Sequence, residues 1–274
     1  TSGNDIKLAV GAAGSVHSAG VAGTSNTVLG VDAGIGLEAG SNYNVFIGDL
    51  VGDSSLDNAT NNVGVGYQAL SGIEEGDGNV AIGYQAMLAN TNAGGNVAVG
   101  MNAGDSNLTG GSNVWVGRNA GGATTDVDST VCIGRDAGQA NMTNAADGTV
   151  AIGYSSGAAI TSGAGNVMIG FATAPVATTI NYNVIIGHGA SNDLTTASNS
   201  NVIIGFGAMD KATDSADSNV AIGLYAMGNL VGEDVNNCVA VGQQAMAGVL
   251  EEESSGTVAI GHSALTAITS GEKN

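Results

Sequence analysis

Three histidines and two cysteines are the residues best suited to acid–base or nucleophilic chemistry in this 274-residue chain. Such chemistry needs a nucleophile and a base within hydrogen-bonding reach of each other. His188 and His262 each follow a glycine of a repeated block, and His17 lies outside any clear block. The sequence pairs none of them with a nucleophile. We therefore expect no catalytic site and no enzymatic function.

The two cysteines lie too far apart for a bridge if each repeated block forms one layer of a stack. Cys132 and Cys238 fall six blocks apart, which is roughly 29 Å at the spacing of neighbouring strands. A disulfide needs Cα atoms within about 7 Å. We predict two reduced, partly buried thiols, and no cluster of Cys and His suggests a zinc site.

Acidic residues are the other candidates, because carboxylates suit calcium. They gather in the variable half of the blocks, and we favour a solvated face over cation binding. We expect no metal, no cofactor and, without a phosphate-binding Gly-Lys-Ser/Thr loop, no nucleotide. The clustered residues are Glu74, Glu75, Asp77, Asp126, Asp128, Asp214, Asp217, Glu233, Asp234, Glu251, Glu252 and Glu253.

Composition excludes several classes of protein. The chain has 46 glycines but a single proline, which rules out a collagen-like helix, and its 43% of hydrophobic residues argues against disorder. With 24 acidic and only 5 basic residues the net charge is −19, so nucleic acid is a poor partner. No apolar stretch approaches the roughly 20 residues of a membrane-spanning helix, so we expect no membrane insertion.

A repeat organises almost the whole chain. Fifteen glycines recur at intervals of 17 to 19 residues, and we call them the anchor glycines. Residues 1–274 therefore read as one repeat domain without a second domain. The anchor glycines are Gly11, Gly30, Gly48, Gly66, Gly83, Gly100, Gly117, Gly134, Gly153, Gly170, Gly187, Gly205, Gly223, Gly242 and Gly261.

Each block predicts a short strand. The positions three and one before the anchor glycine are almost always Val, Ile or Leu, as in Val80 and Ile82. A spacing of two places both side chains on one face of a strand, and β-branched residues favour that conformation. Turn-forming residues fill the rest. The sequence predicts an all-β protein, a parallel β-solenoid of about fifteen coils of 17–19 residues, with a structural Asn four before most anchors.

The repeated unit resembles that of a known family. Asn79-Val-Ala-Ile-Gly83 followed by Ala86 is similar to the head repeat of YadA-like trimeric autotransporter adhesins, and similar Ala-Ile-Gly-Tyr repeats occur in phage tail-fibre regions. The resemblance covers about residues 8 to 268. It implies a left-handed β-roll assembled as a homotrimeric rod. Because the coils are longer than those of adhesin heads, we favour a structural and adhesive virion protein, such as a tail fibre for host attachment.

Two other functions stay open. The first is the head of a bacterial adhesin on the cell surface. The second is a hexapeptide-type acyltransferase, whose aliphatic residue at every sixth position fails here, since Gly122 and Asp128 follow Val116. For the leading function we expect a virion appendage, with other copies of the chain and neighbouring fibre or virion proteins as partners.

Host surface glycans or proteins are the remaining partners that the sequence suggests. Aromatic residues at a fixed turn position could form a strip that contacts them, although aromatics at such positions more often pack against the protein itself. Five lie directly after an anchor glycine: Tyr67, Tyr84, Tyr154, Phe171 and Phe206.

The residue between the two aliphatic positions suggests oligomerisation. If the flanking pair faces the interior of the coil, this middle residue faces outward, yet it is apolar or glycine in every block. A strand that is apolar on both faces is buried on both faces. We therefore predict that the middle residues form an oligomer interface, including Phe46, Ala81, Ala98, Trp115, Cys132, Met168, Ile185, Ile203 and Ala221.

Overall fold

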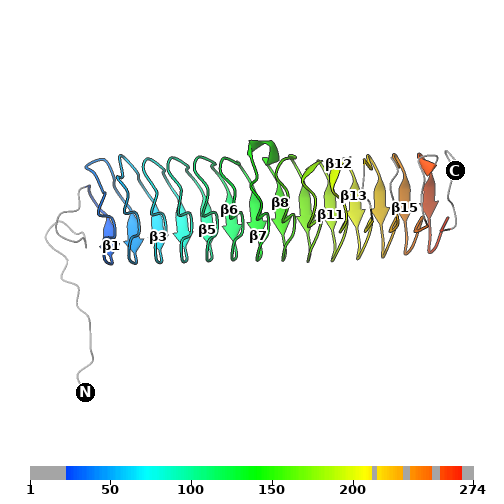
Figure 1. Cartoon of the computed structure of the whole chain (residues 1–274), viewed down its shortest axis with the longest axis horizontal. Helices are drawn as coiled ribbons and strands as arrows, with labels where there is room; N and C mark the ends of the chain where they lie inside the picture. Colours follow the sequence, from blue (N-terminus) through cyan, green and yellow to red (C-terminus); the bar gives the residue numbers. More distant parts are fainter. Residues whose placement is uncertain (1–22, 212–214, 231–234, 249–253, 267–274) are drawn as a thin grey trace, which may run out of the picture.

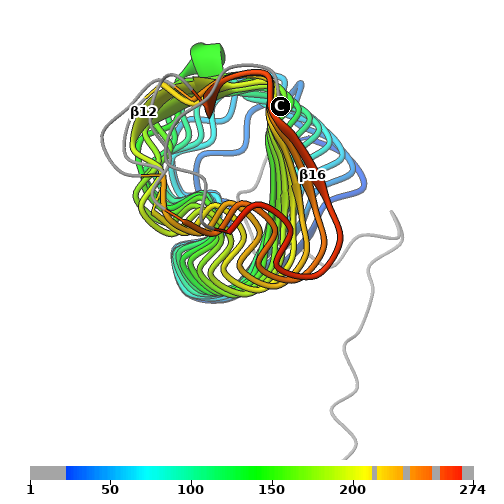
Figure 2. The same cartoon turned by 90° about the vertical axis from the view of Figure 1, so that its right-hand side faces the viewer.

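The chain folds into a straight rod of stacked coils. The computed structural model describes residues 23–211, 215–230, 235–248 and 254–266. Figure 1 shows the strands lying side by side along the rod, and in the end view of Figure 2 successive coils lie almost behind one another. The predicted all-β, parallel solenoid is confirmed; the coil predicted at Gly11 lies outside the described residues.

Each coil contributes one short strand to a single long sheet. The sheet has fourteen strands, all parallel and each paired with the next in unbroken register. Its strands are β1 (Thr27–Leu29), β2 (Val45–Ile47), β3 (Val63–Val65), β4 (Val80–Ile82), β5 (Val97–Val99), β6 (Val114–Val116), β7 (Val131–Ile133), β8 (Val150–Ile152), β9 (Val167–Ile169), β11 (Val184–Ile186), β13 (Val202–Ile204), β14 (Val220–Ile222), β15 (Val239–Val241) and β16 (Val258–Ile260).

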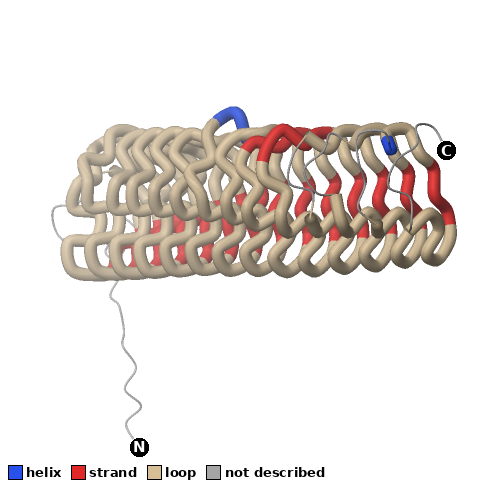
Figure 3. The backbone as a smooth tube through the Cα atoms, turned by 45° about the vertical axis from the view of Figure 1, so that its right-hand side comes forward, coloured by secondary structure: helices blue, strands red, loops and turns tan. Residues whose placement is uncertain are grey.

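The remaining parts of the coils are mostly turns, as Figure 3 shows. Within the described residues, only β10 (Thr179–Asn181) and β12 (Thr196–Asn199) form a second, two-stranded parallel sheet, and η1 (Asn144–Ala146) is a single 3-10 turn. Backbone N–H groups in the turns donate to carbonyls of the adjacent coil, as Gly104 N does to Ala120 O at 3.0 Å. The stacking therefore satisfies the backbone without long strands.

The middle residue of each strand lies inside the coil, so the predicted orientation is wrong. Its side chain is buried in the single chain, from Phe46 and Trp115 to Met168, while the residues on either side are partly or fully exposed. The residues predicted as an oligomer interface therefore form the core and cannot contact a second chain. They are Phe46, Ala81, Ala98, Trp115, Cys132, Met168, Ile185, Ile203 and Ala221.

Glycines four residues after an anchor make room for the large core side chains. A Cβ on Gly52 would lie 2.7 Å from the Phe46 ring, and one on Gly121 would lie 2.4 Å from the Trp115 ring. In several coils with a small middle residue, a larger one occupies the position four after the anchor, as with Gly64 and Leu70. The two positions share one volume, because a close-packed interior tolerates neither voids nor overlap.

A ladder of buried asparagines runs along the interior, four residues before the anchors. The Asn96 amide Nδ2 donates to Gly110 O at 2.9 Å, and its Oδ1 accepts from Asn113 N at 2.9 Å. The predicted structural role of these asparagines is thus confirmed. Thr130, Thr149, Cys238 and Thr257 take the same position in four coils.

The anchor glycines are required by the turn that ends each strand. Gly100 has φ +141°, and a Cβ there would lie 2.5 Å from the carbonyl oxygen of Gly117 in the next coil. Both the left-handed backbone and the close approach exclude other residues. The close contact between anchor glycines of successive coils therefore limits how closely the coils stack.

Candidate interaction surface

The two aliphatic positions of each strand form a continuous outward surface, which we call the strand face. Of its 28 residues in β1 to β9, β11 and β13 to β16, 27 are Val, Ile or Leu, and only Thr27 is polar. Most are half-buried by their neighbours along the sheet, while Ile82 stays 40% exposed and Ile260 70% exposed. The face is thus apolar and accessible, and it carries no charge along the described rod.

The residue directly after each anchor glycine forms a second line along the rod, which we call the post-glycine column. It borders the strand face where the chain turns away from the sheet. Its described members are Val31, Asp49, Tyr67, Tyr84, Met101, Arg118, Arg135, Tyr154, Phe171, His188, Phe206, Leu224, Gln243 and His262. The five predicted aromatic residues all belong to it.

Rings in this column stack on one another. Tyr67 and Tyr84 have centroids 5.5 Å apart and are nearly parallel. A longer stack runs from Tyr154 at 4.9 Å to Phe171, at 4.8 Å to His188 and at 5.1 Å to Phe206. The faces of the inner rings are therefore covered by their neighbours. A sugar that needs a free ring face would find only ring edges there, so the stack serves mainly as packing between coils.

Sequence reasoning missed the cation at the start of this stack. The Arg135 guanidinium carbon lies 4.2 Å from the centroid of Tyr154, a cation–π contact that covers the remaining face of that ring. Arg118 lies one coil earlier in the same column. The available signal was the pair of arginines at the same position in successive blocks of a chain with only five basic residues.

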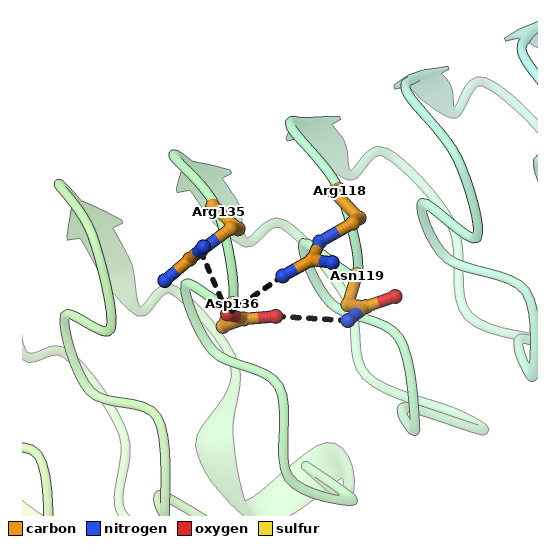
Figure 4. A network of polar contacts seen from close by, with 4 residues as sticks. All are labelled: Arg118, Asn119, Arg135 and Asp136. Atoms are coloured by element: carbon orange, nitrogen blue, oxygen red, sulfur yellow. Dashed lines mark hydrogen bonds and ion pairs between the residues drawn. The ribbon is translucent and has the colours of Figure 1, made fainter.

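A single carboxylate holds both arginines, as Figure 4 shows. The Asp136 Oδ2 atom lies 3.2 Å from Arg135 Nε and 3.8 Å from Arg118 Nη2. Asn119 Nδ2 donates to the other oxygen, Oδ1, at 2.8 Å. The Asp136 side chain is only 16% exposed, whereas the two arginine side chains are 46% and 48% exposed. The group therefore carries one net positive charge at the surface.

Several of the predicted acidic residues have a structural role. Asp77 Oδ1 accepts from the backbone N and the hydroxyl of Thr60, at 2.6 and 2.8 Å. Asp128 Oδ1 likewise accepts from Gly111 N at 2.6 Å. These carboxylates satisfy N–H groups of the preceding coil. Among the residues described, no three His, Cys, Asp or Glu side chains group as metal ligands would. Asp214, Glu233, Asp234, Glu251, Glu252 and Glu253 lie outside the described residues.

Three of the candidate chemical residues are built into the packing. His188 lies between Phe171 and Phe206, whereas His262 is exposed and His17 lies outside the described residues. Both cysteines are free, as predicted, and they are completely rather than partly buried. Burial raises the pKa of Cys132 to about 12 and also raises the pKa of Cys238. These thiols stay protonated at neutral pH and are therefore poor nucleophiles.

No protein-family model matches the chain, and no curated protein is similar to it. In the part of the chain that the structure describes, no helix has the length and apolar character needed to span a membrane.

Proposed function

We propose that this chain is a structural and adhesive rod of a virion, a tail fibre or related appendage, which assembles as a homotrimer for host attachment. The strand face is the observation that carries this proposal. Its two apolar columns extend over thirteen strand spacings, about 62 Å, with a footprint of roughly 600 Å². That is at the upper end of the apolar patches on soluble monomers, and patches of this size are often functional, which supports a partner on this face.

A second copy of the chain is the occupant that fits this face best. The face repeats at the strand spacing, and only a partner with the same repeat can stay in register over its full length. A second rod of this protein has that repeat. Val and Ile side chains at every rung after β1 allow close packing of neighbouring rods, and a closed cyclic arrangement covers the face in each copy.

Three-fold symmetry, a left-handed coil and the virion setting are supported by the resemblance of the repeats to those of adhesin heads and tail fibres. The same rod would serve a bacterial adhesin equally well, so that function stays as the alternative. The neighbouring genes distinguish them: capsid and tail genes favour a virion, whereas a secretion signal with a membrane anchor favours an adhesin.

Native mass by light scattering tests the assembly. We expect about three times the chain mass of 26.5 kDa for the wild type. Ile152→Asp with Ile186→Asp places charges on the strand face, and we expect folded rods of lower mass. A wild-type monomer, or a folded double variant with unchanged mass, would contradict the proposal.

Matched controls come from the opposite side of the same strands. Ala151→Ser adds a small polar group to the core rather than to the strand face. It should lower thermal stability without changing the mass of the assembly. Circular dichroism of each variant separates loss of assembly from loss of fold.

A further inference from the structure

The strand face and post-glycine column differ in charge from the rest of the molecule. The protein has a net charge of −19, yet the described post-glycine column contains one carboxylate, Asp49, and two arginines, Arg118 and Arg135. The strand face beside it has no charged residue. Of the three Lys and Arg residues that the structure describes, only Lys211 lies elsewhere. The arginine pair is therefore a local positive spot.

The pair is held in place with most of its hydrogen-bonding capacity unused. An arginine carries five N–H donors, and Asp136 lies against one nitrogen of each guanidinium. Asn119 fixes the second oxygen of that carboxylate, so Asp136 cannot turn to neutralise either arginine more fully. About half of each arginine side chain is open to solvent.

Neighbouring coils pre-organise the pair further. Arg135 lies over Tyr154, whose other face stacks on Phe171, so a column of rings helps to hold its guanidinium in place. On the other side, Asn119 N donates to Met101 O at 2.9 Å, which places the exposed Met101 one rung from Arg118. A fixed guanidinium loses little conformational entropy when it binds a planar anion.

We infer that Arg118 and Arg135 form a binding site for the carboxylate of an acidic sugar, a uronate or sialate residue of a host glycan. Guanidinium forks match a carboxylate in a bidentate manner. One net positive charge suits one carboxylate, whereas the charge of the whole molecule repels long polyanions. That the carboxylate belongs to a sugar, and not to another kind of molecule, follows from the attachment function proposed above. The inference rests on that function for this point only.

Methionine methyl groups provide a direct readout of this site. With ¹³C-methyl-labelled methionine, we expect D-glucuronate to shift the Met101 signal, identified by its loss in Met101→Leu. The signals of the buried Met87 and Met142 should stay in place. D-Glucose, the matched neutral sugar, should leave Met101 unchanged. N-Acetylneuraminate, titrated in parallel, tells whether sialate or uronate binds more tightly.

Arginine variants decide whether the pair binds the sugar. Arg118→Gln should weaken glucuronate binding by about tenfold or more, and the double variant with Arg135→Gln should abolish it. Arg118→Lys with Arg135→Lys keeps the charge but loses the fork, so binding should still weaken. Circular dichroism checks the fold of each variant.

Three results would overturn the inference: no Met101 shift with either acidic sugar, an equal shift with glucose, or unchanged binding by the folded Gln variant. Measuring the native mass of the same variants distinguishes a failure of the sugar-binding inference from a failure of the proposed homotrimer. A Gln variant with lower mass would instead place the arginines at a contact between copies, and a wild-type monomer that binds glucuronate would contradict only the homotrimer.

Discussion

Trp115 fills the space that Gly104 leaves open in the preceding coil. A Cβ on Gly104 would lie 2.2 Å from Cε3 of Trp115, and the ring is completely buried. The core of the rod is therefore not a uniform aliphatic cylinder. At this point the core of one coil is filled by a side chain of the next coil.

This relationship predicts a strong coupling between the two positions. Gly104→Ala should destabilise the wild type by several kcal/mol, on the order of 2–4, through overpacking and its positive φ of 56°. Trp115→Ala should cost about 3–5 kcal/mol because it leaves a cavity. In the Trp115→Ala background Gly104→Ala should cost much less. Denaturant unfolding of the two single variants and the double variant measures the coupling, and simple additivity would contradict the packing described.

Anchor glycines should be the least replaceable residues of the rod. Gly100→Ala meets both the left-handed backbone and the carbonyl of Gly117, so we expect loss of the cooperative fold or at least about 4 kcal/mol of stability. Gly78 is the matched control, since its φ is +67° with no atom within 4 Å of a Cβ. Gly78→Ala should cost only about 1–2 kcal/mol. Similar melting temperatures for the two variants would rule out the close approach as the cause.

The asparagine ladder should contribute more to stability than asparagines at the surface. Asn96→Ala removes two hydrogen bonds and leaves Asn113 N without its acceptor, while Gly110 O keeps the bond from Asn107 Nδ2, so we expect a loss of about 1–3 kcal/mol. Asn92 is exposed, and Asn92→Ala should change stability by less than about 0.5 kcal/mol. Chemical denaturation measures the free energy of unfolding of both variants. Equal losses would mean that the buried asparagines contribute no more to stability than an exposed asparagine does.

Asp210 makes stability depend on pH in a defined direction. Burial, and after it the charge of Asp193, raise the pKa of Asp210, whereas Lys211 lowers it. Because the pKa is higher in the folded state than in the unfolded state, stability decreases as pH rises through the interval between the two values. Asp193→Asn should lower the pKa of Asp210 and stabilise the rod at pH 7, by less than about 1 kcal/mol because both carboxylates are partly exposed to solvent.

The gain from Asp193→Asn should shrink near pH 3, where Asp210 is protonated in both states. Asp32→Asn, at another exposed carboxylate, changes the net charge equally and serves as the control. Thermal melts at both pH values, with NMR titration of Asp210, provide the measurement. A gain of the same size at pH 3 would show that Asp193 acts through something other than its charge.

The sequence by itself determined the repeat, the parallel strands and the place of each turn. Alternating Val and Ile before a glycine at a period of 17 to 19 residues leaves few ways to pair backbone groups, and stacked strands satisfy them all. Turn residues such as Gly100 have a conformation that only glycine adopts readily, so the glycines in the sequence mark the turns. The buried, reduced cysteines followed from the same stacking.

Only the tertiary structure decided which side of the strand faces the core. Period-two alternation separates Val80 and Ile82 from Ala81 but is the same whichever set lies inside. The sequence feature that distinguishes the two sides is a compensation in side-chain size between positions six residues apart. Gly64 is paired in this way with Leu70, and Trp115 with Gly121. Side chains that pack in the same part of the interior must compensate for one another in volume, whereas side chains on the surface are under no such constraint. The Arg118–Asp136–Arg135 group likewise depends on contacts between coils, which no single block contains.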